Sequence, residues 1–105
     1  MAEISTTDLT TLQSLMQGVQ NVVDAPMAFE RGDPDKTRIR EIQALAGMIL
    51  RGELTAGNGD RLLQLLQQLT LLFEGIAGVG TRVSLKPAAR LVDHAVGVLR
   101  NSTDS

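Results

Sequence analysis

The sequence contains no cysteine, no tryptophan and no tyrosine, and its aromatic residues are Phe29 and Phe73. Without cysteine the chain can form no disulfide, no thiolate nucleophile and no cysteine-ligated zinc site. With so few aromatic rings it also lacks the platforms on which single-stranded nucleic-acid modules stack bases. The core must therefore be built from aliphatic side chains, mostly Leu, Val, Ile, Ala and Met.

The chain also lacks an excess of positive charge, because its formal net charge is −2 and its pI is about 5.2. A protein that binds phosphate backbones is normally basic, so this balance speaks against nucleic acid as the partner. Among the cations, eight Arg stand against two Lys, a bias that is typical of GC-rich bacterial or phage genomes.

Signals for secretion and for membrane insertion are missing as well. Residues 1–8 contain two acids and no basic residue, which does not fit a secretory signal. Residues 62–80 approach the length of a membrane span, but they include Gln64 and Glu74, whereas a span needs about 20 residues with few polar groups. We expect a cytoplasmic protein that does not enter a membrane.

No arrangement of residues predicts catalysis, a cofactor or a metal. His94 is the single histidine, and helical spacing places it opposite the apolar face of its own segment, as for an ordinary surface histidine. Asp33 and Asp35 flank a proline and are explained by a turn and a helix cap. The glycine-rich stretch 75–80 lacks the lysine of a phosphate-binding P-loop. The sequence therefore predicts a protein that is not an enzyme.

Apolar residues recur at spacings of three and four in four segments, and no run keeps the period of two that marks a strand. This pattern predicts a small all-α domain spanning residues 1–105, either a four-helix bundle or two helical hairpins that pack within a dimer. The expected flexible tails are residues 1–5 and 101–105. The expected helices cover residues 7–23, 35–51, 59–76 and 84–100.

Helix-capping residues, glycines and prolines predict where these helices begin and end. Asp35 is a plausible cap for the second helix, and Gly52 ends it. Glycines after the third helix predict a frayed end, followed by a brief extended turn over residues 81–85. Ser84 is the expected N-cap of the last helix, with Pro87 tolerated in its first turn.

The third helix carries most of its leucines on one broad face, which predicts a central position in the packing. Leu71 is different, because it lies about 180° from the centre of that face. The positions on the same side as Leu71 are polar or lack a side chain, and they comprise Gln64, Gln67 or Gln68, Gly75 and Gly78. Missing side chains at the glycines would let another helix approach closely, so Leu71 and these neighbours are the predicted contact with another chain.

Two other apolar features extend this predicted interface. Met48 projects away from the apolar stripe of its own helix, and methionine suits adaptable binding surfaces. Met27 and Phe29 lie in a short apolar segment between the first two helices. The eight predicted interface residues are Leu71, Gln64, Gln68, Gly75, Gly78, Met48, Met27 and Phe29.

The surplus of apolar surface and the absence of chemistry favour a homodimeric protein that binds another protein. Such a regulator, adaptor, anti-activator or chaperone would act by occluding a surface of its partner. The alternative is a DNA-binding transcriptional regulator that uses its second and third helices as a helix-turn-helix. Four arginines could gather on one side for this purpose, namely Arg38, Arg40, Arg51 and Arg61.

Overall fold

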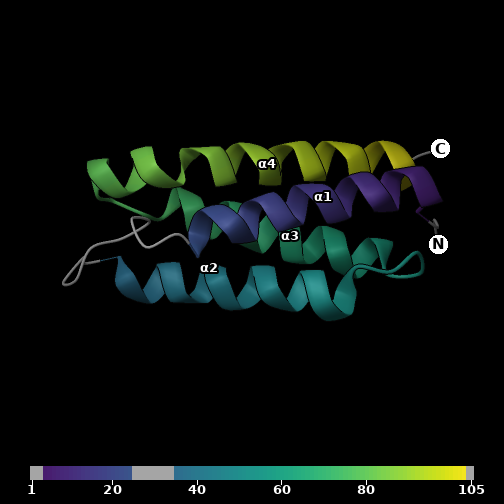
Figure 1. Ribbon diagram of the computed structural model, residues 1–105, viewed down its shortest axis with the longest axis horizontal. Coiled ribbons are helices and arrows are strands. Elements are labelled where there is room, and N and C mark those ends of the chain that lie inside the picture. Colours follow the sequence, from purple (N-terminus) through teal and green to yellow (C-terminus); the bar gives the residue numbers. More distant parts are fainter. Residues whose placement is uncertain (1–3, 25–34, 104–105) are drawn as a thin grey trace.

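Four α-helices run along the long axis of the molecule (Figure 1), whose computed structural model describes residues 4–24 and 35–103. The expectation of an all-α fold with four helices is confirmed for these residues. A single π-helical turn, η1 (Ile49–Glu53), follows the second helix. The α-helices are α1 (Thr6–Val23), α2 (Lys36–Met48), α3 (Gly59–Glu74) and α4 (Val79–Thr103).

The helices alternate in direction and form a four-helix bundle. Each helix contacts the helix before it and after it in the chain, and α1 also contacts α4, so that the ring closes. In the diagonal pairs α1–α3 and α2–α4, no two Cα atoms of the described residues lie within 8 Å of each other. The start of α1 and the end of α4 lie at the same end of the bundle (Figure 1). The apolar faces of the four helices therefore pack against each other within a single chain.

Aliphatic side chains from all four helices fill the core. Leu66 on α3 and Met16 on α1 are fully buried, as expected from helical spacing. Every buried side-chain N or O atom of the described residues has a hydrogen-bond partner. The largest fully buried side chains are Leu12, Met16, Ile39, Ile42, Ile49, Leu62, Leu65, Leu66, Leu69, Ile76, Leu85 and Leu99.

A glycine brings α1 and α4 close together. A Cβ placed on Gly18 would lie 2.9 Å from Cδ1 of Leu91, so the Leu91 side chain occupies the space that a side chain at position 18 would need. On the other side of α1, the Gln43 side-chain amide donates a 2.7 Å hydrogen bond to the carbonyl of Val23. These contacts join α1 to both of its neighbours.

The start of α4 differs from the sequence expectation. The helix begins at Val79 and not at Ser84, so residues 81–85 are helical and not extended. The Ser84 hydroxyl does not cap the helix but donates backwards to the carbonyls of Gly80 and Thr81 at 3.2 and 3.0 Å. This back-bonding is typical of serine inside a helix. Pro87 therefore lies well inside α4, on its exposed surface.

The second helix and both chain ends also depart from the expected boundaries. The α-helical part of the second helix ends at Met48, and the wider turn η1 carries the chain to Glu53. At the N-terminus, Ile4 is 3% exposed and its backbone N–H donates to the carbonyl of Ala56 at 3.1 Å. At the other end, α4 continues to Thr103, past the expected end at residue 100.

Candidate functional site

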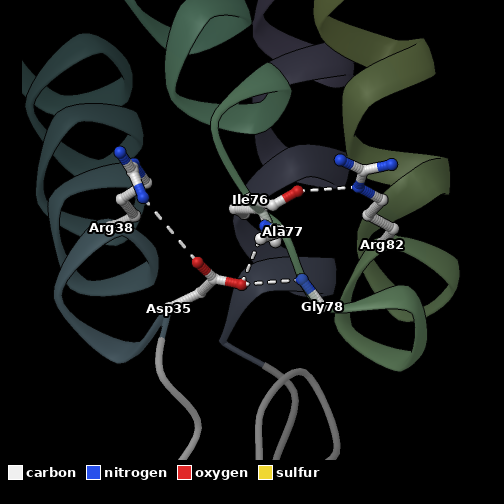
Figure 2. A network of polar contacts seen from close by, with 6 residues as sticks. All are labelled: Asp35, Arg38, Ile76, Ala77, Gly78 and Arg82. Atoms are coloured by element: carbon white, nitrogen blue, oxygen red, sulfur yellow. Dashed lines mark hydrogen bonds and ion pairs between the residues drawn. The ribbon is translucent and has the colours of Figure 1, made fainter.

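The turn between α3 and α4 is held by a carboxylate from the start of α2 (Figure 2). Oδ2 of Asp35 accepts hydrogen bonds from the backbone N–H groups of Ala77 and Gly78, both at 3.0 Å. Oδ1 of Asp35 lies 3.8 Å from Nη1 of Arg38. Asp35 is at the N-cap position of α2, but its side chain makes no capping hydrogen bond there. The sequence analysis correctly placed Asp35 at the start of the second helix, but the prediction that its side chain caps this helix was wrong.

An arginine fixes the same turn from the other side. Nε of Arg82 donates a 2.7 Å hydrogen bond to the carbonyl of Ile76 (Figure 2). The backbone N–H of Arg82 also donates to the carbonyl of Gly78 at 2.8 Å, which closes the first turn of α4. Together with Asp35, these bonds place Val79 at the start of a helix.

Leu71 is 66% exposed and lies in a groove between α3 and α4 that we call the Leu71 groove. Its volume is about 420 Å³. The residues that contribute to it include Thr70, Leu71 and Glu74 of α3 and Asp93, Val96 and Arg100 of α4. Because α3 and α4 run in opposite directions, the two acids lie toward one end of the groove and Arg100 toward the other.

Of the two glutamines that were considered beside Leu71, Gln67 lines this groove and Gln68 does not. Gln68 and Met48 line a second groove between α2 and α3, where Met48 is 38% exposed. Gln64 is exposed on α3, two turns before Leu71. Met27 and Phe29 lie outside the described residues. The structure therefore brings Gln68 together with Met48, and places Leu71 apart from both.

Side chains of the same chain occupy the space beside the two predicted interface glycines. A Cβ on Gly75 would lie 2.9 Å from Nε of Arg38. A Cβ on Gly78 would lie 3.2 Å from Oγ1 of Thr81 and 3.5 Å from Oδ2 of Asp35. Both glycines thus have a role inside the monomer, where they leave room for a polar side chain.

The sequence reasoning missed a third groove at the start of α4, which we call the Val79 groove. Val79 is 76% exposed and Val83 is 67% exposed, and these are large values for apolar side chains. With Phe73, Ile76 and Arg82, they line a hollow of about 420 Å³. The signal in the sequence was the spacing of Val79, Arg82, Val83 and Lys86, which is helical. The glycines before it and the polar neighbours of Val83 instead favoured a frayed helix end and an extended turn.

His94 is exposed on α4. Among the residues that the structure describes, no three His, Asp or Glu side chains gather where they could hold a metal ion. None of the helices in this part of the chain combines the length and the apolar character that crossing a membrane requires.

Comparison of the chain with protein-family models, with curated proteins and with solved structures gives no match.

Proposed function

We propose that this protein is a non-catalytic regulator or adaptor, of the anti-activator or chaperone kind, that acts in the cytoplasm as a homodimer. It would bind a partner protein through apolar helix faces and occlude a surface of that partner. The observation that carries the proposal is the exposure of Leu71, an apolar side chain that is 66% exposed within a shallow groove whose charged residues are Glu74, Asp93 and Arg100. Leu71 shares this groove with the half-buried Val96, so an apolar contact from another chain would remove both side chains from water.

The charges of the Leu71 groove support a second copy of the chain as one occupant. In a two-fold dimer the same surface meets itself, so each charge must face an opposite one. An axis through Leu71 would bring Arg100 of one protomer toward the partner's Glu74 and the partner's Asp93, because these charges lie at opposite ends of the groove. Leu71 would then be buried against its own counterpart.

The DNA-binding alternative gains no comparable support. In a helix-turn-helix the two helices cross at roughly 90–120°, whereas α2 and α3 run side by side in opposite directions (Figure 1). Two of the four arginines contact their own chain, because Arg38 lies beside Asp35 and Arg51 lies over Gly47. A gel shift with duplex DNA at low salt, compared between the wild type and Arg40→Ala, would detect any remaining DNA binding.

Substitution of Leu71 tests the dimer. Leu71→Arg should convert the dimer to a monomer, because it places two cations on the axis, while the helical circular dichroism remains. Val79→Arg is the matched control, since Val79 is at least as exposed but lies in a different groove. Light scattering after size exclusion, at tens of micromolar protomer, measures the result. A wild-type chain that is monomeric under these conditions would remove the dimer from the proposal.

Partner binding needs its own measurement. Affinity capture from the native cell, followed by reconstitution from purified components, should give a complex that forms with the wild type. We expect the purified partner to lose a measurable activity or interaction when it is bound, because the mechanism is occlusion. A reconstituted complex that leaves every activity of the partner unchanged would favour an adaptor over an anti-activator.

A further inference from the structure

The first turns of α4 extend beyond the end of α1 (Figure 1). Val79 and Val83 lie on this part of α4, one helical turn apart, so their side chains are neighbours on one face. They are the two most exposed of the large apolar side chains in the described residues, at 76% and 67%. The core of the bundle uses other residues of α4, such as Leu85 and Ala88, so the fold itself gives no reason for valines on the outer face.

A formed hollow lies beside these valines. Ile76 and Leu85 are 1% and 2% exposed and form its floor, and the half-buried Phe73 lines it as well. The volume of about 420 Å³ falls in the range of roughly 300–1,000 Å³ that is usual for binding pockets. The hollow is open to solvent, so an apolar side chain of another chain can enter it from outside.

Among the residues that the structure describes, the charged side chains that line the Val79 groove are both cations. Arg82 and Lys86 line it, and Arg90 follows one turn later on the same outer face as Lys86. No acidic residue occurs between positions 75 and 92. Asp35 lies near the turn, but it is 3% exposed and bound to two backbone N–H groups, so its carboxylate is not directed at the groove. The Nε bond to Ile76 holds Arg82 in place at the rim.

We propose that the Val79 groove is the docking site for an acidic amphipathic segment of a partner protein. Apolar side chains of that segment would enter the hollow between Phe73 and Val83, and its carboxylates would pair with Arg82 and Lys86. A helix that carries apolar residues at three- and four-residue spacing, with Asp or Glu beside them, presents this combination. The inference rests on the proposed function in one respect, namely that the partner is a protein.

The same features argue against nucleic acid and lipid as occupants. A nucleic-acid backbone would use the cations but has no apolar side chain to fill the hollow. Anionic membranes bind helices that carry many cations and a broad apolar face with Trp, Phe or Leu, whereas this surface offers two valines and the chain has a net charge of −2. An acidic protein segment uses both the hollow and the cations.

Selection of peptides on the full-length protein tests the inference. A phage-displayed library of random peptides is selected on the immobilised wild type, and the recovered peptides are synthesised with a fluorescent label. We expect them to be acidic, with apolar residues at helical spacing, and to bind more weakly as salt is raised. Val79→Ser combined with Val83→Ser, and separately Lys86→Glu, should weaken their binding by about tenfold or more. All three substituted positions are exposed, so the helical circular dichroism should not change.

The controls separate this inference from the proposed function. Arg40→Glu reverses an exposed cation on α2 and should leave peptide affinity within about twofold of the wild type. Peptides without an acidic bias, or peptides that bind the double serine variant as tightly as the wild type, would overturn the inference. If Leu71→Arg abolishes binding and the double serine variant does not, the partner site lies in the Leu71 groove, and the proposed function stands without this inference.

Other occupants are measured directly. The wild type is mixed with phosphatidylserine-containing vesicles in a flotation assay and with duplex DNA in a gel shift. Suppose that the wild type binds vesicles or DNA, that Lys86→Glu loses this binding, and that the peptide selection yields no binder. The Val79 groove would then be assigned to the vesicle or DNA ligand, and the proposal would be overturned. No binding to either, together with acidic peptides from the selection, supports it.

Discussion

The carboxylate of Asp35 accepts a 3.0 Å hydrogen bond from the backbone N–H of Gly78, a residue 43 positions later in the chain. The same oxygen accepts the N–H of Ala77. A buried side chain at the start of α2 thus binds the turn that precedes α4, and two elements that are distant in sequence fix each other. The Val79 groove begins directly after this turn, so its shape depends on this contact.

Removal of the Asp35 carboxylate should therefore destabilise the protein. Hydrogen bonds to charged groups contribute about 1.5–3 kcal/mol each, and an unpaired backbone N–H adds a desolvation cost. We expect Asp35→Ala to lower the free energy of unfolding by about 3 kcal/mol, and Asp35→Asn, which keeps one acceptor oxygen, to lower it less. Because the chain has no Trp or Tyr, urea unfolding is followed by far-ultraviolet circular dichroism.

A matched substitution shows whether the loss comes from this contact. Glu41→Ala removes an exposed carboxylate from α2 and should change the free energy of unfolding by less than about 0.5 kcal/mol. If Asp35→Ala falls within the same range, the bonds to Ala77 and Gly78 do not stabilise the fold as described.

The local pattern of the sequence was enough to find the helices but not their contacts. Leu71 was predicted to be exposed because its angle relative to the other leucines of α3 depends on helical geometry alone. The predicted start of α4 was wrong because the glycines favoured a turn, whereas hydrogen bonds to Asp35, which is distant in sequence, and from Arg82 fix the start of the helix at Val79. For the same reason the Val79 groove could not be predicted, since its floor comes from α3, the turn and α4 together.

The predicted interface shows the same limit. Helical spacing found residues that point away from the core, but the groove that each lines depends on which helix lies next to it. Leu71 faces the α3–α4 groove, whereas Gln68, three residues earlier, faces α2 and Met48. Gly75 was interpreted as a gap for another chain, but Arg38 of the same chain lies beside it.

Two glycines in helices should respond differently to alanine. Nothing lies within 4 Å of a Cβ placed on Gly97, which is exposed on α4. Gly97→Ala should therefore stabilise the protein by about 0.5–1 kcal/mol, the usual gain of alanine over glycine within a helix. Thermal unfolding followed by circular dichroism measures this gain.

At Gly18 the same gain is opposed by a contact. The new Cβ would lie 2.9 Å from Cδ1 of Leu91, so the Leu91 side chain must turn away or α1 must shift. We expect Gly18→Ala to be less stabilising than Gly97→Ala or to be destabilising. In a Leu91→Ala background the obstacle is gone, and Gly18→Ala should recover most of the helical gain. Equal effects of Gly18→Ala in both backgrounds would show that Leu91 does not oppose it.

The two faces of α3 should differ in their sensitivity to truncation. Leu66 is fully buried in the core, and Leu66→Ala should cost about 2–5 kcal/mol, because it removes transfer free energy and leaves a cavity. Leu71→Ala should change the stability of the monomer by less than about 0.5 kcal/mol. Both are measured by urea unfolding at a protein concentration below that of dimer formation. A large cost at Leu71 under these conditions would mean that it packs within its own chain.

Ile4 gives the last test, because the N-terminal residues were expected to form a free tail. The structure instead buries Ile4 in the core cluster and bonds its N–H to the α2–α3 connection at Ala56. Ile4→Ala should therefore cost about 2 kcal/mol, and Ile4→Val less than about 1 kcal/mol, in proportion to the apolar volume removed. Ser5→Ala, which removes the N-cap acceptor for Asp8, should cost about 1 kcal/mol by a different mechanism. If Ile4→Ala leaves the urea midpoint unchanged while Ser5→Ala lowers it, then α1 is capped in solution but the segment before it does not pack against the bundle.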